Sequence, residues 1–272
     1  MTTNQIPFLA QARTLHGQLR ASRETAPAAF VRAVLQQVAS PDSYAPIETS
    51  RGRFFVAFNE RGVSAIDEAA DETEFEDWFR GRLGRRARRV DALPRRLEHP
   101  LRRRLEGDRR ARVRVDLSGI TPFERDVLEK TAHIPHGEVR PYAWVAREIG
   151  RPRAVRAVGT ALAHNPIPLV IPCHRVVRSD GTIGQYGLGG PERKRQFLTE
   201  EGVPLPELQS LAAAGIRYLG SDTTSIFCLP TCHDARRTTA RHLVTFRSAE
   251  ESFAAGYRPC MHCRPVAAQV AA

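Results

Sequence analysis

The sequence predicts an α+β protein with more than one domain. Its 272 residues exceed the usual domain length of about 100–200 residues. Apolar and polar residues alternate as in strands in the first half, whereas helical periodicity dominates the middle. Two close pairs of cysteines follow near the C-terminus. These observations divide the chain into a mixed N-terminal module, a helical domain and a small cysteine-rich domain.

The composition is that of an ordinary soluble protein, with 42% apolar and 26% charged residues. No apolar run approaches the length of about 18 residues that a membrane span needs. The first residues also lack the basic flank and apolar core of a signal peptide. We therefore expect a cytoplasmic protein, in which clustered thiols stay reduced and serve as metal ligands or nucleophiles.

The net charge of +11 is concentrated in one stretch. Between Arg80 and Arg114 there are 15 Arg against 4 acidic residues, so this stretch alone carries the charge of the whole chain. Such a charge favours an anionic partner, of which nucleic acid is the usual one. A solvated surface rich in Arg is an equally weighted alternative, and we assign this stretch no specific role.

The N-terminal part is predicted to contain a helical extension and a mixed module. Residues 1–44 show a loose helical stripe that ends at a Ser-Pro-Asp break, and we assign this extension no function. In the module at 45–118, the alternation of Phe54, Val56 and Phe58 before an Asn-Glu-Arg-Gly turn predicts a β-hairpin. An amphipathic helix is expected over 75–83 and a strand over 113–117.

The helical domain is expected to span 119–204. Thr121 is a predicted N-cap, followed by a Pro at the first helical position and a reciprocal Glu124. Helices over 141–149 and 153–163, separated by Gly-Arg-Pro, predict a helix-turn-helix, and a last helix is expected over 191–201. The Pro-Leu-Pro at 204–206 predicts a boundary, with a linker at 205–215.

The C-terminal domain, predicted over 216–266, contains four of the five cysteines as 228-CLPTC-232 and 260-CMHC-263. Two thiol pairs separated by a loop can converge on one tetrahedral zinc ion, so we expect zinc bound by four ligands: Cys228, Cys232, Cys260 and Cys263. The adjacent His233 and His262 are alternative ligands. The spacing leaves open whether the zinc is purely structural or activates one thiolate.

The fifth cysteine, Cys173, stands alone and is followed by His174. A histidine can activate a thiol, but neighbours on an extended segment point to opposite sides, so a relay between them needs a bridging water. The alternative is a buried structural cysteine. A cysteine protease is disfavoured because no oxyanion-hole pattern or third catalytic residue accompanies the pair.

The sequence around Cys173 resembles the O6-alkylguanine-DNA alkyltransferases. The resemblance rests on 137-GEVRPYAWVA-146, 154-AVRAVGTALAHNPIPLVIPCHRVV-177, 184-GQY-186 and 200-EEG-202. It implies a ribonuclease-H-like module at 45–118 and a winged-helix-like active-site domain at 119–204. It further implies single-turnover DNA repair without a small-molecule methyl donor, in which an alkyl group passes from O6-alkylguanine in double-stranded DNA to the protein. O4-alkylthymine is a second candidate lesion, and we expect a monomer.

The resemblance also implies catalytic roles for individual residues of this chain. Cys173 is the acceptor, His174 is the base acting through water, and Glu201 orients that histidine. Tyr142 donates a proton or a hydrogen bond to the departing guanine. Asn165 holds the turn before the active-site segment.

A second group of residues is implied to contact DNA. Arg156 fills the space that the flipped base leaves, and the small residues Ala157 and Gly159 allow the helix to approach the backbone closely. Tyr186 forms a wall of the pocket. This chain departs from the family at Gly187, where relatives often carry Ser, which leaves the size of the pocket undetermined.

The tail resembles the metal-binding domain of Ada-type adaptive-response proteins, on the residues 218-YLGSDTTSIFCLPTC-232 and 253-FAAGYRPCMHCRP-265. In that family the first cysteine also accepts a methyl group from DNA methylphosphotriesters, which makes Cys228 a second acceptor here. Leu229 stands where the family usually has Arg, and His233-Asp234 displaces the next basic residues. Because Ada-type proteins change their DNA affinity when that first cysteine is methylated, the resemblance implies as an alternative function a zinc-dependent sensor or regulator of alkylation damage. A third hypothesis, a non-repairing alkyltransferase-like binder, is disfavoured because such relatives lack the cysteine that this chain retains.

Overall fold

The computed structural model describes residue 27 and residues 42–108, 110–180 and 182–266. The predicted helical extension at 1–44 lies outside these residues, apart from Pro27 and 42–44. Residues 42–44 are not helical, because strand β1 (Asp42–Thr49) begins at Asp42. The N-terminal module therefore starts three residues earlier than predicted.

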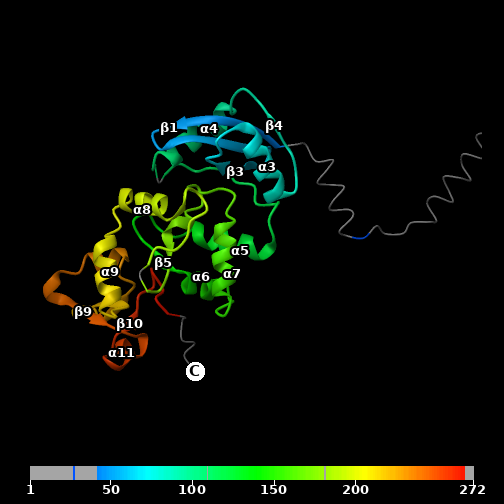
Figure 1. The fold of residues 1–272 in the computed structure, drawn as a ribbon. Helices are drawn as coiled ribbons and strands as arrows, with labels where there is room; N and C mark the ends of the chain where they lie inside the picture. Colours follow the sequence, from blue (N-terminus) through cyan, green and yellow to red (C-terminus); the bar gives the residue numbers. More distant parts are fainter. Residues whose placement is uncertain (1–26, 28–41, 109, 181, 267–272) are drawn as a thin grey trace, which may run out of the picture. The chain divides into compact units, whose positions relative to one another are not determined.

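A four-stranded sheet in the order β3-β2-β1-β4 forms the N-terminal module (Figure 1). The predicted hairpin is confirmed as β2 (Gly52–Asn59) and β3 (Gly62–Asp67). β1 pairs antiparallel with β2, and β4 (Ala87–Arg89) is parallel to β1 over 42–44 only. β1 was not predicted, since it contains Pro46. Beyond Tyr44 it has no partner on the β4 side, and a proline is tolerated on such an edge.

The strand expected over 113–117 is reduced to a single bridge between Val63 and Val115. The Val63 nitrogen donates to the Arg114 oxygen at 2.9 Å, and the Asp116 nitrogen donates to the Val63 oxygen at 2.7 Å. Gly62 permits this approach, because a Cβ there would lie 2.3 Å from the Arg114 oxygen. The backbone of residues 114–116 can therefore approach β3 this closely only because position 62 has no side chain.

Two helices complete the module. The predicted amphipathic helix is α3 (Glu72–Leu83), which begins at an Asp71 N-cap and buries Phe75, Phe79 and Leu83. The second helix, α4 (Arg95–Leu105), was not predicted, because it contains Pro100 and many arginines. Its buried residues are Leu101 and Leu105, four apart on one face.

The helical domain begins with α5 (Pro122–Ala132), whose Thr121 and Glu124 form the predicted capping box. Helices α6 (Tyr142–Glu148) and α7 (Val155–Ala163) are the predicted pair separated by a turn. Helices α5, α6 and α7 pack against one another (Figure 1). Two short strands, β5 (Arg140–Pro141) and β6 (Val176–Val177), pair in parallel and connect α6 to the segment that contains Cys173.

Cys173 begins a short 3-10 turn, η1 (Cys173–Arg175), which leads into β6. The predicted last helix is α8 (Gly190–Glu200). The expected linker at 205–215 is instead largely helix α9 (Leu205–Ala213). Its first residue, Leu205, is buried in a cluster with Val139 and Val177 of the helical domain. Pro204 and Pro206 lie at the start of this helix, where proline is tolerated.

The C-terminal domain is a second four-stranded sheet in the order β10-β8-β7-β9. Its strands are β7 (Tyr218–Ser221), β8 (Ile226–Cys228), β9 (Leu243–Phe246) and β10 (Arg258–Pro259). The helical elements are α10 (His233–Arg236), η2 (Ala240–His242) and α11 (Ala249–Ala254). Ser248 caps α11 by accepting from the Glu251 nitrogen.

One cluster of buried side chains runs through all three parts, from Tyr44 and Phe55 through Trp144 to Leu219 and Cys263. The cysteine-rich domain is therefore packed against the helical domain and does not stand apart from it. Among the described residues, no helix is long and apolar enough to cross a membrane.

Candidate functional site

Cys173 is buried, with 5% of its surface exposed, and Asn165 holds its sulfur. The Asn165 Nδ2 donates to the Cys173 Sγ at 3.0 Å and to the Ile171 oxygen at 2.9 Å, while its Oδ1 accepts from the Ile167 nitrogen at 3.1 Å. Burial raises the pKa of the Cys173 thiol, and the Asn165 hydrogen bond offsets this only in part. Asn165 therefore ties the turn before Cys173 directly to the sulfur.

His174 does not contact the sulfur but points to a buried carboxylate. Its Nε2 lies 2.9 Å from the Glu201 Oε1. Burial lowers the pKa of His174, which keeps the imidazole neutral at neutral pH. Its Nδ1 is buried and has no hydrogen-bond partner among the described residues. This nitrogen is the one free to receive a proton through a water.

Arg175 is a site residue that the sequence analysis missed. Its Nε and Nη2 donate to the two Glu201 oxygens, each at 2.8 Å, and its Nη1 donates to the Ile134 oxygen at 2.7 Å. Burial alone would raise the pKa of Glu201, but the hydrogen bonds from His174 and Arg175, together with the charge of Arg175, hold that pKa well below its ordinary value. Glu201 thus stays ionised and held on two sides.

Cys173 lies at one wall of an open cavity of about 480 Å³. Of the other predicted site residues, the cavity lining includes Tyr142, Arg156, Gly159 and Tyr186. Burial raises the pKa of Tyr142, so its hydroxyl stays protonated and can donate. Ala157 is exposed on the same helix α7 but does not line the cavity.

Tyr186 and Gly187 shape the opposite wall. The Tyr186 ring packs edge-on against His174 with centroids 6.2 Å apart, and its buried hydroxyl has no partner among the described residues. A Cβ on Gly187 would lie 2.8 Å from the Ala163 oxygen at the end of α7. The absence of a side chain here therefore lets the pocket loop lie directly on the helix.

Lys194 is a second buried residue that was missed. It is 1% exposed, its Nζ donates to the Val176 oxygen at 2.6 Å, and it lies 5.7 Å from the centroid of the Tyr142 ring. Burial lowers its pKa to about 8. Helical spacing could have found it, because positions 194, 197, 198 and 201 share one face of α8 and its C-cap.

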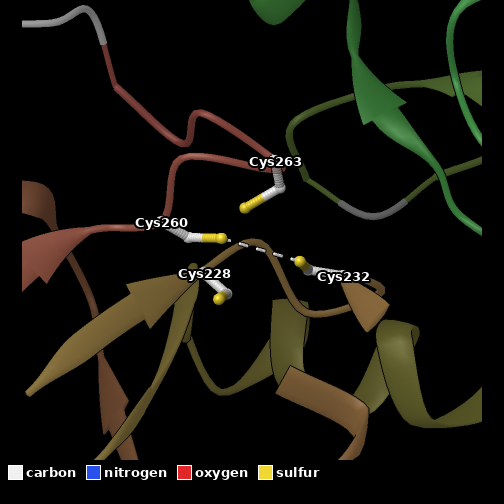
Figure 2. Close-up of side chains that lie close together, drawn as sticks. All are labelled: Cys228, Cys232, Cys260 and Cys263. Atoms are coloured by element: carbon white, nitrogen blue, oxygen red, sulfur yellow. Dashed lines mark hydrogen bonds between the residues drawn. The ribbon is translucent and has the colours of Figure 1, made fainter. Parts of the chain in front are cut away.

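The four paired cysteines converge as predicted. Their Sγ atoms all lie within 4.8 Å of one another, and those of Cys232 and Cys260 are 4.0 Å apart (Figure 2). Zinc–sulfur bonds of about 2.3 Å in a tetrahedron would place the sulfurs about 3.8 Å apart, so the cluster fits this ion. Hydrogen bonding from Cys232 raises the pKa of Cys228, and hydrogen bonding with Cys228 lowers that of Cys260. A cation would relieve this crowding of thiolates.

The two neighbouring histidines are not part of this sulfur cluster. His262 is exposed, and its Nδ1 lies 2.6 Å from the Asp234 Oδ2, which raises its pKa. His233 is exposed, and its backbone nitrogen donates to Glu138. The four sulfurs are therefore the ligand set that the geometry favours.

Cys228 lines an open cavity of about 550 Å³. Arg237, Thr238 and Thr239 line the same cavity. The adjacent Leu229 is buried and lines a different cavity, which it shares with Val139 and Trp144 of the helical domain. The position where relatives of the tail carry Arg is thus part of an apolar contact between domains.

Many arginines of the 80–114 stretch have partners within the protein. Arg85 contacts Asp42 at 2.8 Å and Asp116 at 3.0 Å, and Arg82 contacts Glu124 at 2.9 Å. Further ion pairs with acidic residues are made by Arg80, Arg89, Arg102 and Arg103. Part of the charge is therefore used to join elements of the fold.

Two families match separate parts of the chain. Residues 122–203 match the family described as 6-O-methylguanine DNA methyltransferase, DNA binding domain. Residues 209–266 match the family described as metal binding domain of Ada. The first match contains Cys173 and Glu201, and the second contains all four clustered cysteines.

Curated relatives and a solved structure are similar to part of the chain. The methylated-DNA–protein-cysteine methyltransferase of Rattus norvegicus is 44% identical over 100 residues, which are 36% of this chain and 46% of that protein. The protein of the same name from Mycobacterium bovis is 47% identical over 89 residues, 33% of this chain and 53% of that protein. The chain thus spans about half the length of these relatives. A crystal structure of Mycobacterium tuberculosis OGT in complex with DNA has a TM-score of 0.49 and 29% identity, and covers 61% of this chain and 98% of that one.

Proposed function

We propose that this chain, which joins a DNA-binding domain of the 6-O-methylguanine DNA methyltransferase family to a metal-binding domain of Ada, repairs alkylated DNA directly. The alkyl group of O6-alkylguanine passes irreversibly to Cys173 in a single turnover, with O4-alkylthymine as a second candidate lesion. The observation that carries this proposal is the cavity at which Cys173, Tyr142 and Arg156 meet, with His174 and Glu201 behind it.

The reaction is one in-line displacement. The Cys173 sulfur forms a bond to the alkyl carbon while the bond from that carbon to the guanine O6 breaks. The thiol proton leaves through a water to the Nδ1 of His174, which the ionised Glu201 stabilises as an imidazolium. The guanine takes a proton from the Tyr142 hydroxyl, and the proton on His174 then returns to the Tyr142 oxygen through solvent. The net products are a thioether and a neutral guanine, with both side chains back in their starting protonation states.

Access to the cavity requires the target base to leave the DNA stack, at a cost of a few kcal/mol. Arg156 is exposed on α7 and lines the cavity, so its guanidinium can take the place of the flipped base. Ala157 and Gly159 keep the surface of that helix low against the DNA backbone. In this arrangement the protein acts as a monomer on double-stranded DNA.

The finer fold assignments belong to the same proposal. The module that starts at Asp42 and ends near 118 is assigned as ribonuclease-H-like, which its antiparallel β1–β3 meander and parallel β4 support. The domain at 119–204 is assigned as winged-helix-like on the packing of α5, α6 and α7. Zinc is the metal assigned to the domain at 216–266, where it would hold the two cysteine loops together.

A second candidate activity is methyl transfer from DNA methylphosphotriesters to Cys228, through which the tail would sense alkylation damage. The observation that favours it is the open cavity beside Cys228, with Arg237 and two threonines able to contact a phosphate. The direct test is DNA that carries only methylphosphotriesters. Label on the peptide with Cys228 supports this activity, and an unlabelled tail refutes it.

The main proposal is tested by incubating the full chain with duplex DNA containing O6-methylguanine, followed by peptide mass spectrometry. We expect one added methyl group on the peptide that contains Cys173. The matched variants are Cys173→Ser, which should lose transfer but retain duplex binding, and Arg156→Ala, which should transfer more slowly. Transfer to another residue, or none from a folded wild-type chain, refutes the assignment.

A further inference from the structure

We propose that the cysteine-rich domain positions the alkyltransfer site. The connection is segment 137-GEVRPYAW-144, which contacts the loops of the four-cysteine cluster and also contacts the residues around Cys173. An ordered cluster therefore holds Tyr142 and Glu201 in place, and loosening the cluster slows transfer to Cys173. This inference rests on the proposed function only for its consequence on the transfer rate.

Thr231 makes the first contact. It lies between Cys228 and Cys232 and is 1% exposed. Its Oγ1 accepts from the Val139 nitrogen at 2.9 Å and donates to the Val139 oxygen at 3.1 Å. One hydroxyl thus bonds both backbone groups of a buried residue. The Val139 oxygen also accepts from the Arg140 Nη1 at 3.0 Å, so loss of the hydroxyl would chiefly leave the Val139 nitrogen without this partner.

The second cysteine loop makes the next contact. The Trp144 Nε1 donates to the Cys263 oxygen at 2.8 Å, and its ring is 7% exposed. Close by, Arg147 donates to the Arg264 oxygen at 2.6 Å, and Arg264 pairs with Glu148 at 3.0 Å. Both cysteine pairs are therefore bonded to the helical domain within a few residues of their ligand sulfurs.

The first loop adds a contact through α10. The backbone nitrogen of His233 donates to the Glu138 Oε1 at 3.1 Å, and Glu138 also pairs with Arg140 at 2.5 Å. Glu138 is 5% exposed and Arg140 is 2% exposed. This buried pair tolerates little displacement, because moving one partner leaves a charge unpaired in the interior.

The same segment contacts the Cys173 site on its other side. Arg140 and Pro141 pair in parallel with Val176 and Val177, which directly follow the Cys173 turn. The Gly137 nitrogen donates to the Glu201 Oε2 at 3.3 Å. Tyr142 is the next residue after β5. A shift of this segment would therefore displace the proton donor, the carboxylate and the turn that carries the nucleophile.

Energetic coupling between two sites is reciprocal. If metal binding at the four cysteines stabilises segment 137–144, then loss of the contacts to that segment must also weaken metal binding. Typical coupling changes a binding affinity by roughly 5–150-fold. This range sets what the following experiments should detect.

The first experiment uses tryptophan fluorescence, because the chain contains only Trp78 and Trp144. Trp78→Phe leaves Trp144 as the reporter, and removal of zinc by a chelator should shift its emission to longer wavelength as the indole becomes hydrated. The matched variant Trp144→Phe leaves Trp78 in α3, whose emission should not change. An unchanged Trp144 emission in the stripped protein would overturn the proposal, whatever the chain does to DNA.

The second experiment measures single-turnover transfer from O6-methylguanine duplex together with hydrogen exchange of residues 137–144. Thr231→Val removes both bonds to Val139 and should slow transfer roughly fivefold or more, speed exchange of the segment and weaken zinc affinity by a similar factor. Thr231→Ser should restore all three. The control Thr245→Val changes an exposed threonine of β9 and should have no effect.

The outcomes separate the two proposals. A wild-type chain that transfers no alkyl group refutes the proposed function, while emission and exchange still test the coupling. The coupling alone is refuted if the wild-type chain transfers the alkyl group normally and if removal of zinc changes neither the transfer rate nor the hydrogen exchange of residues 137–144. Failure of Thr231→Ser to restore transfer would also refute it, because the serine keeps the hydroxyl.

Discussion

Cys173 and the four cysteines of the C-terminal domain are all nearly inaccessible, with exposures between 0% and 5%, but their surroundings differ. The sulfur of Cys173 receives a hydrogen bond from the neutral side-chain amide of Asn165, and ionised groups lie behind it on His174's side. Each of the other four sulfurs has three further sulfurs within 4.8 Å. Burial is thus common to both regions, and the neighbours decide what each thiol can do.

The two regions differ in how the surroundings affect the protonation of a buried thiol. At Cys173, burial raises the pKa and keeps the proton on sulfur until an acceptor next to it takes that proton. In the cluster, hydrogen bonds between sulfurs raise the pKa of Cys228 and lower that of Cys260, and the four sulfurs lie close enough to share one cation. The first arrangement leaves a single protonated thiol beside a cavity, and the second brings four sulfurs to the spacing of one metal site.

Removal of metal should have the largest effect and should act on one region far more than on the other. Structural zinc sites contribute apparent binding free energies of about 10–16 kcal/mol. We therefore expect a chelator to unfold residues 218–263, as measured by hydrogen exchange, while β1–β3 keep their protection. The control Cys173→Ser should bind one zinc per chain like the wild type. Equal protection of the tail with and without chelator would contradict a metal-dependent domain.

Glu201→Gln should have the next largest effect, on the side of Cys173. The change leaves Arg175 without its buried partner, and breaking such a pair costs about 3–5 kcal/mol. Denaturant unfolding measures this loss, and single-turnover transfer should slow because His174 loses its anionic partner. The neighbouring Glu200→Gln removes a half-exposed pair with Arg51 and should cost less than about 1 kcal/mol. If the two variants lost the same free energy of unfolding, the buried contacts of Glu201 would stabilise the protein no more than an exposed ion pair does.

Gly187→Ala should have a smaller effect, confined to the pocket wall. The added Cβ would lie 2.8 Å from the Ala163 oxygen, and overpacking of this kind costs about 1–3 kcal/mol. Metal affinity should not change. Gly81→Ala is the matched control, because its Cβ meets nothing within 4 Å in helix α3, and it should stabilise the protein by about 0.5–1 kcal/mol. If both substitutions changed the free energy of unfolding in the same direction, the wall at Gly187 would not be crowded.

The pH dependence should show the smallest effect. Between pH 6.5 and 8 we expect the transfer rate to vary less than about twofold, because the thiol stays protonated, His174 stays neutral and the proton moves within the site. Below pH 6.5 the rate should fall, since the lowered pKa of His174 lies there and a charged imidazole cannot accept the proton. Single-turnover rates measured across this range test the idea. A tenfold rise per pH unit above neutrality would mean that thiolate formed with bulk solvent controls the reaction.

Much of the local structure followed from the sequence. The capping box of Thr121 and Glu124, the Asp-Gly-flanked helix α3 and the hairpin β2–β3 are set by neighbours in sequence. β1 and α4 escaped prediction, because Pro46 and Pro100 are unfavourable locally and are tolerated only through the edge position and the packing of Leu101 and Leu105. The predicted linker became α9 for a similar reason, since Leu205 is buried against the helical domain.

The sequence by itself determined the chemistry of the two cysteine regions, since spacing and motif separate a lone Cys173 from two pairs that suit one metal ion. Only the tertiary structure decided what surrounds them. Arg175 and Thr231 gain their importance from partners 26 and 92 residues away, which no local pattern encodes. Distant contacts also placed the cysteine-rich domain against segment 137–144. Local propensity determines which segments form helices and strands. How these elements pack is determined by buried polar groups, because each of them needs a hydrogen-bond partner.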